Sequence, residues 1–330
     1  MIYLHGLGHF YPENVITNKF ISELDIGSDE QWIMERVGIA ERRTSLSLDY
    51  IKKTKNSDPR AASEASIHTR AEAGAAAAAM ALQRAGLSAG DIGMVISGTS
   101  TPHYTIPAEA SIIAAELGIE APCFDINAAC STFVVQMACL GQMSAGHTPN
   151  FVLVVNPENY THVVDYSDRR VAPLFGDGCS AAVISASEPS KKRFEVFDYG
   201  SRPDSWEKVR IPRAGHFSQD GSYVQRFAIR KATEGVRQLQ QQYPADTEKF
   251  KFVGHQANLM MLNTVCRRCD IPESRHLYNV VDFGNTGCSS APAVLSQNWD
   301  RLCPGDHIAV AVVGSGLTWG HTLLKITAEE

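Results

Sequence analysis

Hydrophobic and polar residues follow one another along this 330-residue chain in a pattern that predicts alternating strands and helices. In the first half the expected strands are IYLHGLGHFYP, IGMVISGTS, CFDINAA, NFVLVVN and SAAVISAS. The expected helices are DEQWIMERVG, RAEAGAAAAAMALQRAG, IPAEASIIAAELG and CSTFVVQMACLGQMSAG. Gly38 and Gly86 end two of these helices, because glycine is favoured just beyond the last helical turn. Such alternation predicts an α/β fold.

The second half has a similar order of segments. Its expected strands are FEVFDYGS, KFVGHQAN, HIAVAVVGSG and TWGHTLLKI, and its expected helices are SYVQRFAIRKATEGVRQLQQQY and ANLMMLNTVCRRC. The stretch HLYNVVDFGNTGCSSAPAVLSQNW predicts a strand, a glycine turn and a helix. The similar order indicates an internal duplication of residues 1–187 and 188–330, joined at EPSKKR.

Residues 45–69, SLSLDYIKKTKNSDPRAASEASIHT, interrupt this plan. The segment is polar, charged and only weakly periodic. We expect a solvated surface insertion in the N-terminal half, with a binding lid as the alternative.

Charge and composition narrow the class of protein. The formal net charge is -6 and both signs are mixed along the chain, which argues against a general nucleic-acid binder. No run of about 18 apolar residues is present, so we expect no membrane span. The start, MIYLHGLGHFYPE, lacks the basic and apolar regions of a secretory signal. We therefore expect a cytoplasmic protein whose eight cysteines are mostly free thiols.

Cys266 and Cys269 form a CxxC pair, which is half of a zinc site. No second pair follows at zinc spacing, and the pair lies in an expected helix. A structural role is favoured over a metal or redox role.

Cys130 lies where the expected strand CFDIN gives way to an apolar helix. A thiol at a helix N-terminus is close to free N–H groups and to the positive end of the helix dipole, and both stabilise a nucleophilic thiolate. The helix is apolar all round, so it is expected to be buried, with Cys130 at the floor of a pocket. The alternative is a buried cysteine that only fills space.

Three other stretches carry polar groups at strand ends. His255 and Asn258 follow one apolar strand, and Asn285 lies in a glycine-flanked turn after another. The GSG triplet at residues 314–316 allows close backbone approach, so its N–H groups can face an oxyanion; otherwise it is a plain turn. Since strand ends on one side of a sheet can converge, these residues and Cys130 predict one site with a nucleophile and neutral donors.

Taken together, these residues and their neighbours resemble the β-ketoacyl-acyl carrier protein synthase III (KAS III) family of the thiolase superfamily. The similarity runs from about Tyr3 to Ile326, interrupted by residues 45–69. The motifs that carry it are DEQWIMERVGIAERR, DINAAC, DYSDRRVAPLFGDG, GHQAN, GNTG and GSGLTWG, in family order. The resemblance implies a thiolase-like duplicated αβαβα five-layer fold and a homodimer.

The resemblance also implies roles for individual residues. The catalytic triad is carried onto Cys130, His255 and Asn285, and the oxyanion hole onto the N–H groups of Cys130 and Ser315, with Gly316 as the alternative to Ser315. Five further positions match substrate-binding residues. They are Trp32 and Arg169 on either side of the coenzyme A adenine, Arg36 on its phosphates, Asn258 in the pantetheine tunnel, and Ile106 reaching into the partner's acyl pocket.

Two departures from the family pattern are present. A basic residue often follows HQANL on the carrier-protein docking face, whereas this chain has Met260; Arg226 keeps a neighbouring basic position. Residues 45–69 are the second departure, and they suggest a specialised fatty-acid or polyketide pathway rather than chain initiation in general metabolism.

The resemblance implies a two-step acyltransferase reaction. Cys130 takes an acyl group from acyl-CoA, and decarboxylation of a malonyl thioester, such as malonyl-acyl carrier protein, generates the carbanion that attacks it. His255 and Asn285 donate hydrogen bonds to the developing enolate. No metal is required and no cofactor is expected beyond coenzyme A thioesters as substrates.

Three alternatives remain open at this stage. A relative with the same triad can join two β-ketoacyl chains or pass the acyl group to an alcohol or amine. A papain-like protease also has Cys, His and Asn in chain order, but its CGSCW-type signature is absent. A silent partner subunit of a synthase pair has no need of an intact triad.

Overall fold

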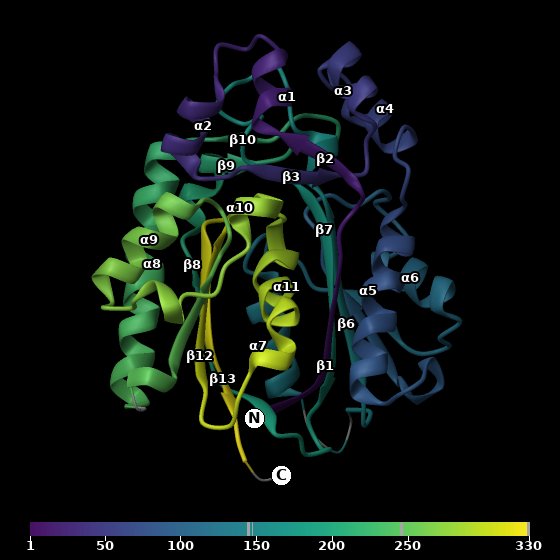
Figure 1. The fold of residues 1–330 in the computed structure, drawn as a ribbon. Coiled ribbons are helices and arrows are strands. Elements are labelled where there is room, and N and C mark those ends of the chain that lie inside the picture. The colour runs from purple at the N-terminus through teal and green to yellow at the C-terminus, as the bar shows by residue number, and fades with distance from the viewer. Residues whose placement is uncertain (144–145, 147, 245–246, 329–330) are drawn as a thin grey trace.

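The computed structural model describes residues 1–143, 146, 148–244 and 247–328, and in it the chain forms five layers (Figure 1). Helices α5 and α6 cover one side of the N-terminal strands, helices α8 and α9 cover the outer side of the C-terminal strands, and α7 and α11 lie between the two sets of strands. This is the duplicated αβαβα arrangement that the family resemblance implies.

Within the described residues, nine strands form one continuous sheet in the order β11-β12-β13-β8-β1-β7-β6-β4-β5. The strands of the N-terminal half are β1 Ile2–Phe10, β4 Met94–Ser97, β5 Cys123–Asp125, β6 Val152–Asn159 and β7 Asp177–Ser185. Those of the C-terminal half are β8 Lys192–Ser201, β11 Phe250–Gly254, β12 His307–Gly314 and β13 Thr318–Ile326. The halves join where Ile2 of β1 pairs with Phe194 of β8.

Pairing follows the same scheme in both halves. β4 pairs parallel with β5 and β6, β6 antiparallel with β7, and β7 antiparallel with β1. In the C-terminal half β11 pairs parallel with β12, β12 antiparallel with β13, and β13 antiparallel with β8. A single parallel bridge between Phe252 and His276 takes the place that the β4–β5 pair has in the first half.

The helices that cover and separate the strands have these bounds: α5 Arg70–Ala85, α6 Glu109–Leu117, α7 Thr132–Gln142, α8 Gly221–Gln242, α9 Leu259–Arg268 and α11 Ser290–Gln297. The smaller elements lie mostly at one end of the sheet (Figure 1). They are α1 Asn18–Glu23, α2 Glu30–Val37, α3 Leu48–Thr54, α4 Pro59–Glu64, α10 Val280–Phe283, β2 Asn14–Thr17, β3 Glu41–Thr44, β9 Val209–Arg210, β10 Ser218–Gln219, and the short helical turns η3 Tyr160–Val163, η4 Pro203–Lys208 and η7 Gly287–Ser289. Among the described residues, no helix combines the length and apolarity needed to cross a membrane.

Helix α7 is buried because both of its faces meet apolar strands. Phe133, Met137 and Leu140 pack in the same core cluster as Val294 of α11 and Leu324 of β13. This packing agrees with the apolar character of α7 on every side, and it fixes the position of its N-terminal end, where Cys130 lies.

Glycine ends α2 and α5 as the sequence predicts. Gly38 and Gly86 follow these helices with φ angles of 66° and 68°, a left-handed conformation that suits glycine. Helix α7 is shorter than predicted, from Thr132 to Gln142, and part of the expected helical stretch, residues 144–145, lies outside the described residues.

The strand predicted in HLYNVVDF is wrong. After the single bridge at His276 the chain leaves the sheet, and Val280–Phe283 forms the one-turn helix α10. The side-chain oxygen of Gln256 accepts hydrogen bonds from the backbone N–H groups of Asn279 and Val280. These bonds satisfy donors that a sheet would otherwise pair, so tertiary contacts override the β-branched composition.

The insertion at residues 45–69 forms the surface helices α3 and α4 but is firmly attached to the protein. Ile51 and Ala62 are fully buried. The side-chain amide of Asn56, also fully buried, donates hydrogen bonds to the carbonyls of Thr161, His162 and Val164. The solvated-loop expectation therefore misses an anchor that ties the insertion to the end of β6.

Candidate active site

Most of the predicted site residues, from both halves, line one cavity of about 940 Å³. Cys130 comes from the loop before α7, and His255 and Ser315 follow strands β11 and β12. Asn285 comes from the turn between α10 and η7, and Asn258 from the start of α9. The strand ends of the two halves thus converge as the sequence predicts.

Cys130 is held in a tight turn as a neutral thiol. Ala129, the residue before it, has a φ angle of 49°. The thiol sulfur lies 3.8 Å from the Tyr160 hydroxyl. Burial, followed by the nearby Glu158, raises the pKa of Cys130 to about 12, and the contact with Tyr160 opposes this rise. The expectation of a thiolate stabilised at rest is therefore wrong, because desolvation outweighs the helix end.

His255 is also neutral. Its backbone N–H donates to the carbonyl of Ala311 on β12, which holds the histidine at the end of β11. Ring atom Nδ1 lies 3.5 Å from the Ser290 hydroxyl oxygen. Burial lowers the pKa of His255 to about 4. A neutral imidazole has one N–H to donate and one nitrogen that can accept a proton.

Asn285 is held by its backbone and its side-chain oxygen. Its N–H donates to the carbonyl of Leu174, and its carbonyl accepts from the N–H of Gly176. Side-chain atom Oδ1 accepts a 2.9 Å hydrogen bond from the N–H of Gly287. Because the oxygen is engaged in the turn, the NH2 group is the part of the amide available for a ligand in the cavity.

The GSG triplet lies directly beside Cys130. A methyl group added at Gly314 would lie 2.9 Å from the Cys130 nitrogen, so only glycine permits this approach. The hydroxyl of Ser315 donates to the carbonyl of Val209, which keeps the serine side chain on strand β9. The backbone after β12, which contains Ser315, and the loop that contains Cys130 thus lie side by side in the cavity.

Trp32 and Arg36 also line the cavity, as do Asp168 and Arg170. The guanidinium carbon of Arg169 lies 4.2 Å from the centre of the Trp32 ring, so these two side chains stack on one another. An aromatic ring can enter between them only if Arg169 moves away. Asn258 uses its side-chain oxygen to cap helix α9 through the N–H of Met261.

Three predicted residues do not line this cavity, namely Arg169, which stacks on Trp32, and Arg226 and Ile106. Arg226 is exposed on α8, next to Gln225, which lines the cavity. Ile106 is 82% exposed, in the segment that precedes α6.

Two functional candidates were missed by sequence reasoning, namely Tyr160 and Glu158. Glu158 is fully buried, and its carboxylate accepts from the N–H groups of Ser100 and Cys288. Tyr160 lines the cavity and contacts the Cys130 thiol. Both lie at the end of the apolar run NFVLVVN, so the strand-end rule that identified His255 could have found them.

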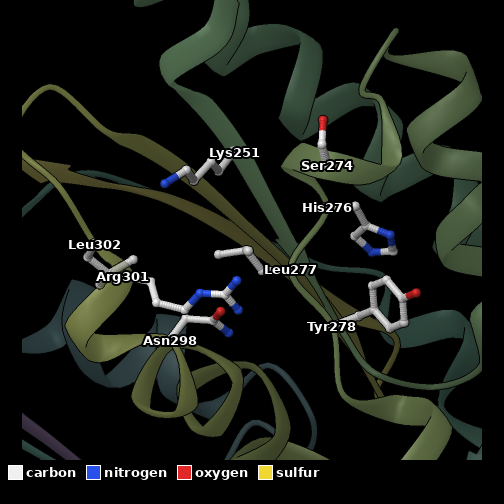
Figure 2. Close-up of a pocket in the computed structure, with 8 residues that line it drawn as sticks. All are labelled: Lys251, Ser274, His276, Leu277, Tyr278, Asn298, Arg301 and Leu302. Carbon is white, nitrogen blue, oxygen red and sulfur yellow. The ribbon is translucent and has the colours of Figure 1, made fainter.

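A second, smaller hollow of about 310 Å³ contains none of the predicted site residues (Figure 2). It is lined by Lys251, Ser274, His276, Leu277, Tyr278, Asn298, Arg301 and Leu302. Lys251 is paired with Asp306 at 2.6 Å, so its charge is already balanced. We therefore place the chemistry in the larger cavity.

Known proteins with similar sequences and structures share this architecture. The family described as 3-Oxoacyl-[acyl-carrier-protein (ACP)] synthase III matches residues 124–203, and its C-terminal part matches residues 246–326. The chain is 30% identical over 338 residues to a beta-ketoacyl-[acyl-carrier-protein] synthase III of Rhodobacter capsulatus, covering 98% of each protein.

Solved structures extend this similarity to the whole fold. The 3-oxoacyl-[acyl-carrier-protein] synthase III of Aquifex aeolicus VF5 aligns with a TM-score of 0.87 and 28% identity, covering 98% of this chain and 100% of that one. The priming beta-ketosynthase from the R1128 polyketide biosynthetic pathway aligns with a TM-score of 0.84 and 26% identity, covering 100% and 97%.

Proposed function

Since the chain belongs to the β-ketoacyl-acyl carrier protein synthase III family of condensing acyltransferases, we propose that it transfers an acyl group from acyl-CoA to Cys130 and condenses it with malonyl-acyl carrier protein. The observation that carries this proposal is the convergence of Cys130, His255, Asn285 and Ser315 on one cavity.

In the first step the Cys130 sulfur attacks the thioester carbonyl. The bond from Cys130 to the acyl carbon forms, the bond to the coenzyme A sulfur breaks, and the thiol proton leaves with coenzyme A. The N–H groups of Cys130 and Ser315 stabilise the tetrahedral oxyanion, and the contact between Gly314 and the Cys130 backbone supports this pairing.

In the second step the neutral donors act. The His255 imidazole and the Asn285 NH2 group donate to the thioester carbonyl of the malonyl group, which stabilises the enolate formed as carbon dioxide leaves. The enolate carbon attacks the acyl carbon, and the bond from that carbon to the Cys130 sulfur breaks. The product is a β-ketoacyl thioester, and the released thiolate takes up a proton from water to restore the Cys130 thiol. The lowered pKa of His255 supports this role, because the ring is neutral at pH 7.

The substrate contacts follow from the positions of the predicted binding residues. Trp32 and Arg169 hold the adenine of coenzyme A after Arg169 separates from the indole, Arg36 contacts its phosphates, and Asn258 lies along the pantetheine arm. Exposed Arg226 receives the acidic carrier protein. The exposed Ile106 completes the acyl pocket of the partner subunit in a homodimer.

We place the reaction in a specialised fatty-acid or polyketide pathway. The anchored insertion at residues 45–69 and the similarity to a priming ketosynthase of a polyketide pathway support this placement.

The test is intact-protein mass spectrometry after incubation with a panel of acyl-CoAs, with Cys130→Ala as the control. A mass gain for one class of chain, absent from the control, supports acyl loading, and release of a β-keto product on addition of malonyl-acyl carrier protein supports the condensation. If the acyl group loads but is released only to a second β-ketoacyl thioester, an alcohol or an amine, then that compound, and not malonyl-acyl carrier protein, is the acceptor. Absence of loading from every donor would contradict the acyl-CoA proposal and favour a silent partner subunit.

A further inference from the structure

The hydroxyl of Tyr160 makes the one side-chain hydrogen bond that the thiol of Cys130 has among the described residues. The oxygen and the sulfur are 3.8 Å apart. Tyr160 opens the short helical turn η3 directly after β6, and it is only 2% exposed. It also lines the cavity, so the contact lies on the side of Cys130 that substrate reaches.

The phenol ring is held so that its hydroxyl keeps this position. It stacks on Phe175 with ring centres 4.7 Å apart and planes 10° apart. On another side it lies against Gly287, where an added methyl group would come within 2.4 Å of the ring. Because the ring is clamped on these sides, the hydroxyl reaches the thiol without the loss of rotational freedom that a mobile side chain would suffer.

Burial and the nearby Glu158 disfavour a negative charge on the Cys130 sulfur, whereas a backbone hydrogen bond and the contact with Tyr160 favour it. The titratable groups around it are Glu158 at the end of β6, Cys288 in η7 and Tyr160, and His255 lines the same cavity. The Glu158 oxygens already accept from the N–H groups of Ser100 and Cys288, and a carboxylate offers no donor to the thiol. Of these groups, Tyr160 is the one placed to donate to the sulfur.

We propose that Tyr160 is a further catalytic residue, whose hydroxyl donates a hydrogen bond to the Cys130 sulfur as it loses its proton and attacks the acyl donor. This inference rests on the proposed acyl loading. The bonds made and broken are those of the loading step itself. Tyr160 keeps its proton throughout, and the thiol proton leaves with coenzyme A. Burial and the neighbouring Cys130 and Glu158 raise the pKa of Tyr160, so the phenol remains a donor.

The test measures the reactivity of Cys130 without any acyl substrate. Iodoacetamide is added between pH 6 and 11, and alkylation of the peptide that contains Cys130 is followed by mass spectrometry. Tyr160→Phe keeps the ring and its stacking, and Tyr166→Phe is the matched control. Tyr166 is another fully buried tyrosine, and its hydroxyl has no hydrogen-bond partner in the described part of the chain.

We expect Cys130 in Tyr160→Phe to alkylate about tenfold more slowly at pH 8, with its pH profile moved upward by roughly one unit, while Tyr166→Phe matches the wild type. The same rate and profile in all three proteins would overturn the proposal. If Tyr160→Phe does not fold, 3-fluorotyrosine at position 160 replaces it: a stronger donor moves the profile downward, and an unmoved profile overturns the proposal. A wild type that alkylates at Cys130 yet accepts no acyl-CoA contradicts the proposed function instead.

Discussion

The backbone of Gly314 lies against the backbone nitrogen of Cys130, so that a methyl group added at Gly314 would lie 2.9 Å from that nitrogen and 3.0 Å from the carbonyl oxygen of Ala128. This contact joins the end of β12 in the C-terminal half to the loop before α7 in the N-terminal half. The spacing between the two proposed oxyanion donors therefore depends on how closely the two halves pack.

Gly314→Ala is expected to push these two loops apart. Loss of one oxyanion donor costs about 10²–10³-fold in rate, so acylation of Cys130 in a single turnover should slow by that order. The rate is measured by quenched intact-protein mass spectrometry. Gly90→Ala is the control, since a methyl group there meets its nearest atom at an ordinary 3.7 Å. Equal acylation rates in both variants would show that the loop spacing does not matter.

Asn285→Asp separates the two ends of the amide. The aspartate keeps an oxygen for the N–H of Gly287 but has no N–H to offer the malonyl carbonyl. Once the enzyme carries an acyl group on Cys130, its rate of malonyl decarboxylation should fall by about 10²–10³-fold, while acyl loading on Cys130 is retained. Release of labelled carbon dioxide measures the first quantity, and intact mass measures the second. If Asn285→Asp loses acyl loading but keeps decarboxylation, the proposed role of Asn285 in the second step is contradicted.

Trp32→Ala tests the proposed adenine contact. Stacking of a base on an aromatic side chain contributes about 1–3 kcal/mol, so KM for an acyl-CoA donor should rise roughly tenfold or more. The same acyl group on N-acetylcysteamine, which has no adenine, serves as the control substrate and should show an unchanged KM. A rise for both substrates would indicate damage to the cavity rather than loss of stacking.

Asn56→Ala removes the amide that anchors the insertion. Three buried carbonyls lose a donor, so the free energy of unfolding should fall by about 3 kcal/mol. Urea denaturation measures the change. Lys53→Ala, an exposed position on α3, should stay within about 0.5 kcal/mol of the wild type. A stable Asn56→Ala protein would mean that the insertion is held by its apolar contacts alone.

Burial of His276, outside the active site, predicts that the folded protein loses stability in acid. Burial lowers the pKa of this histidine from 6.5 to about 4, so between these values the unfolded chain binds a proton that the folded protein does not. Stability should therefore fall as the pH is lowered, by about 3 kcal/mol for this group between pH 7 and 4. His276→Phe keeps a ring against Phe252 and removes that proton, so its stability should depend less steeply on pH in urea denaturation. Parallel curves for the two proteins would contradict the assignment.

The alternation of strands and helices could be predicted because it is a local property of the chain. Gly38 and Gly86 end their helices through their own backbone freedom, and the burial of α7 follows from its apolar faces. The positions of Cys130 and His255 at strand ends could be predicted for the same reason, since an apolar run followed by a polar residue spans only a few neighbouring positions.

Other features depend on residues that are far apart in the sequence. Gln256 satisfies the backbone of α10 in place of a strand partner, and Asn56 is recognised as an anchor only when it meets the carbonyls after β6. No local pattern contains these partners, so the predicted strand is wrong and the expectation of a solvated surface insertion misses its buried anchor.

The sequence by itself determined the layered α/β fold, the family and the identity of the polar groups that meet at the strand ends. Only the tertiary structure decided their chemical state: it buries Cys130 beside Glu158, keeps His255 neutral and sets the Tyr160 hydroxyl against the thiol. The reason is that desolvation and hydrogen bonding act through space, between side chains that the chain brings together only when its two halves pack.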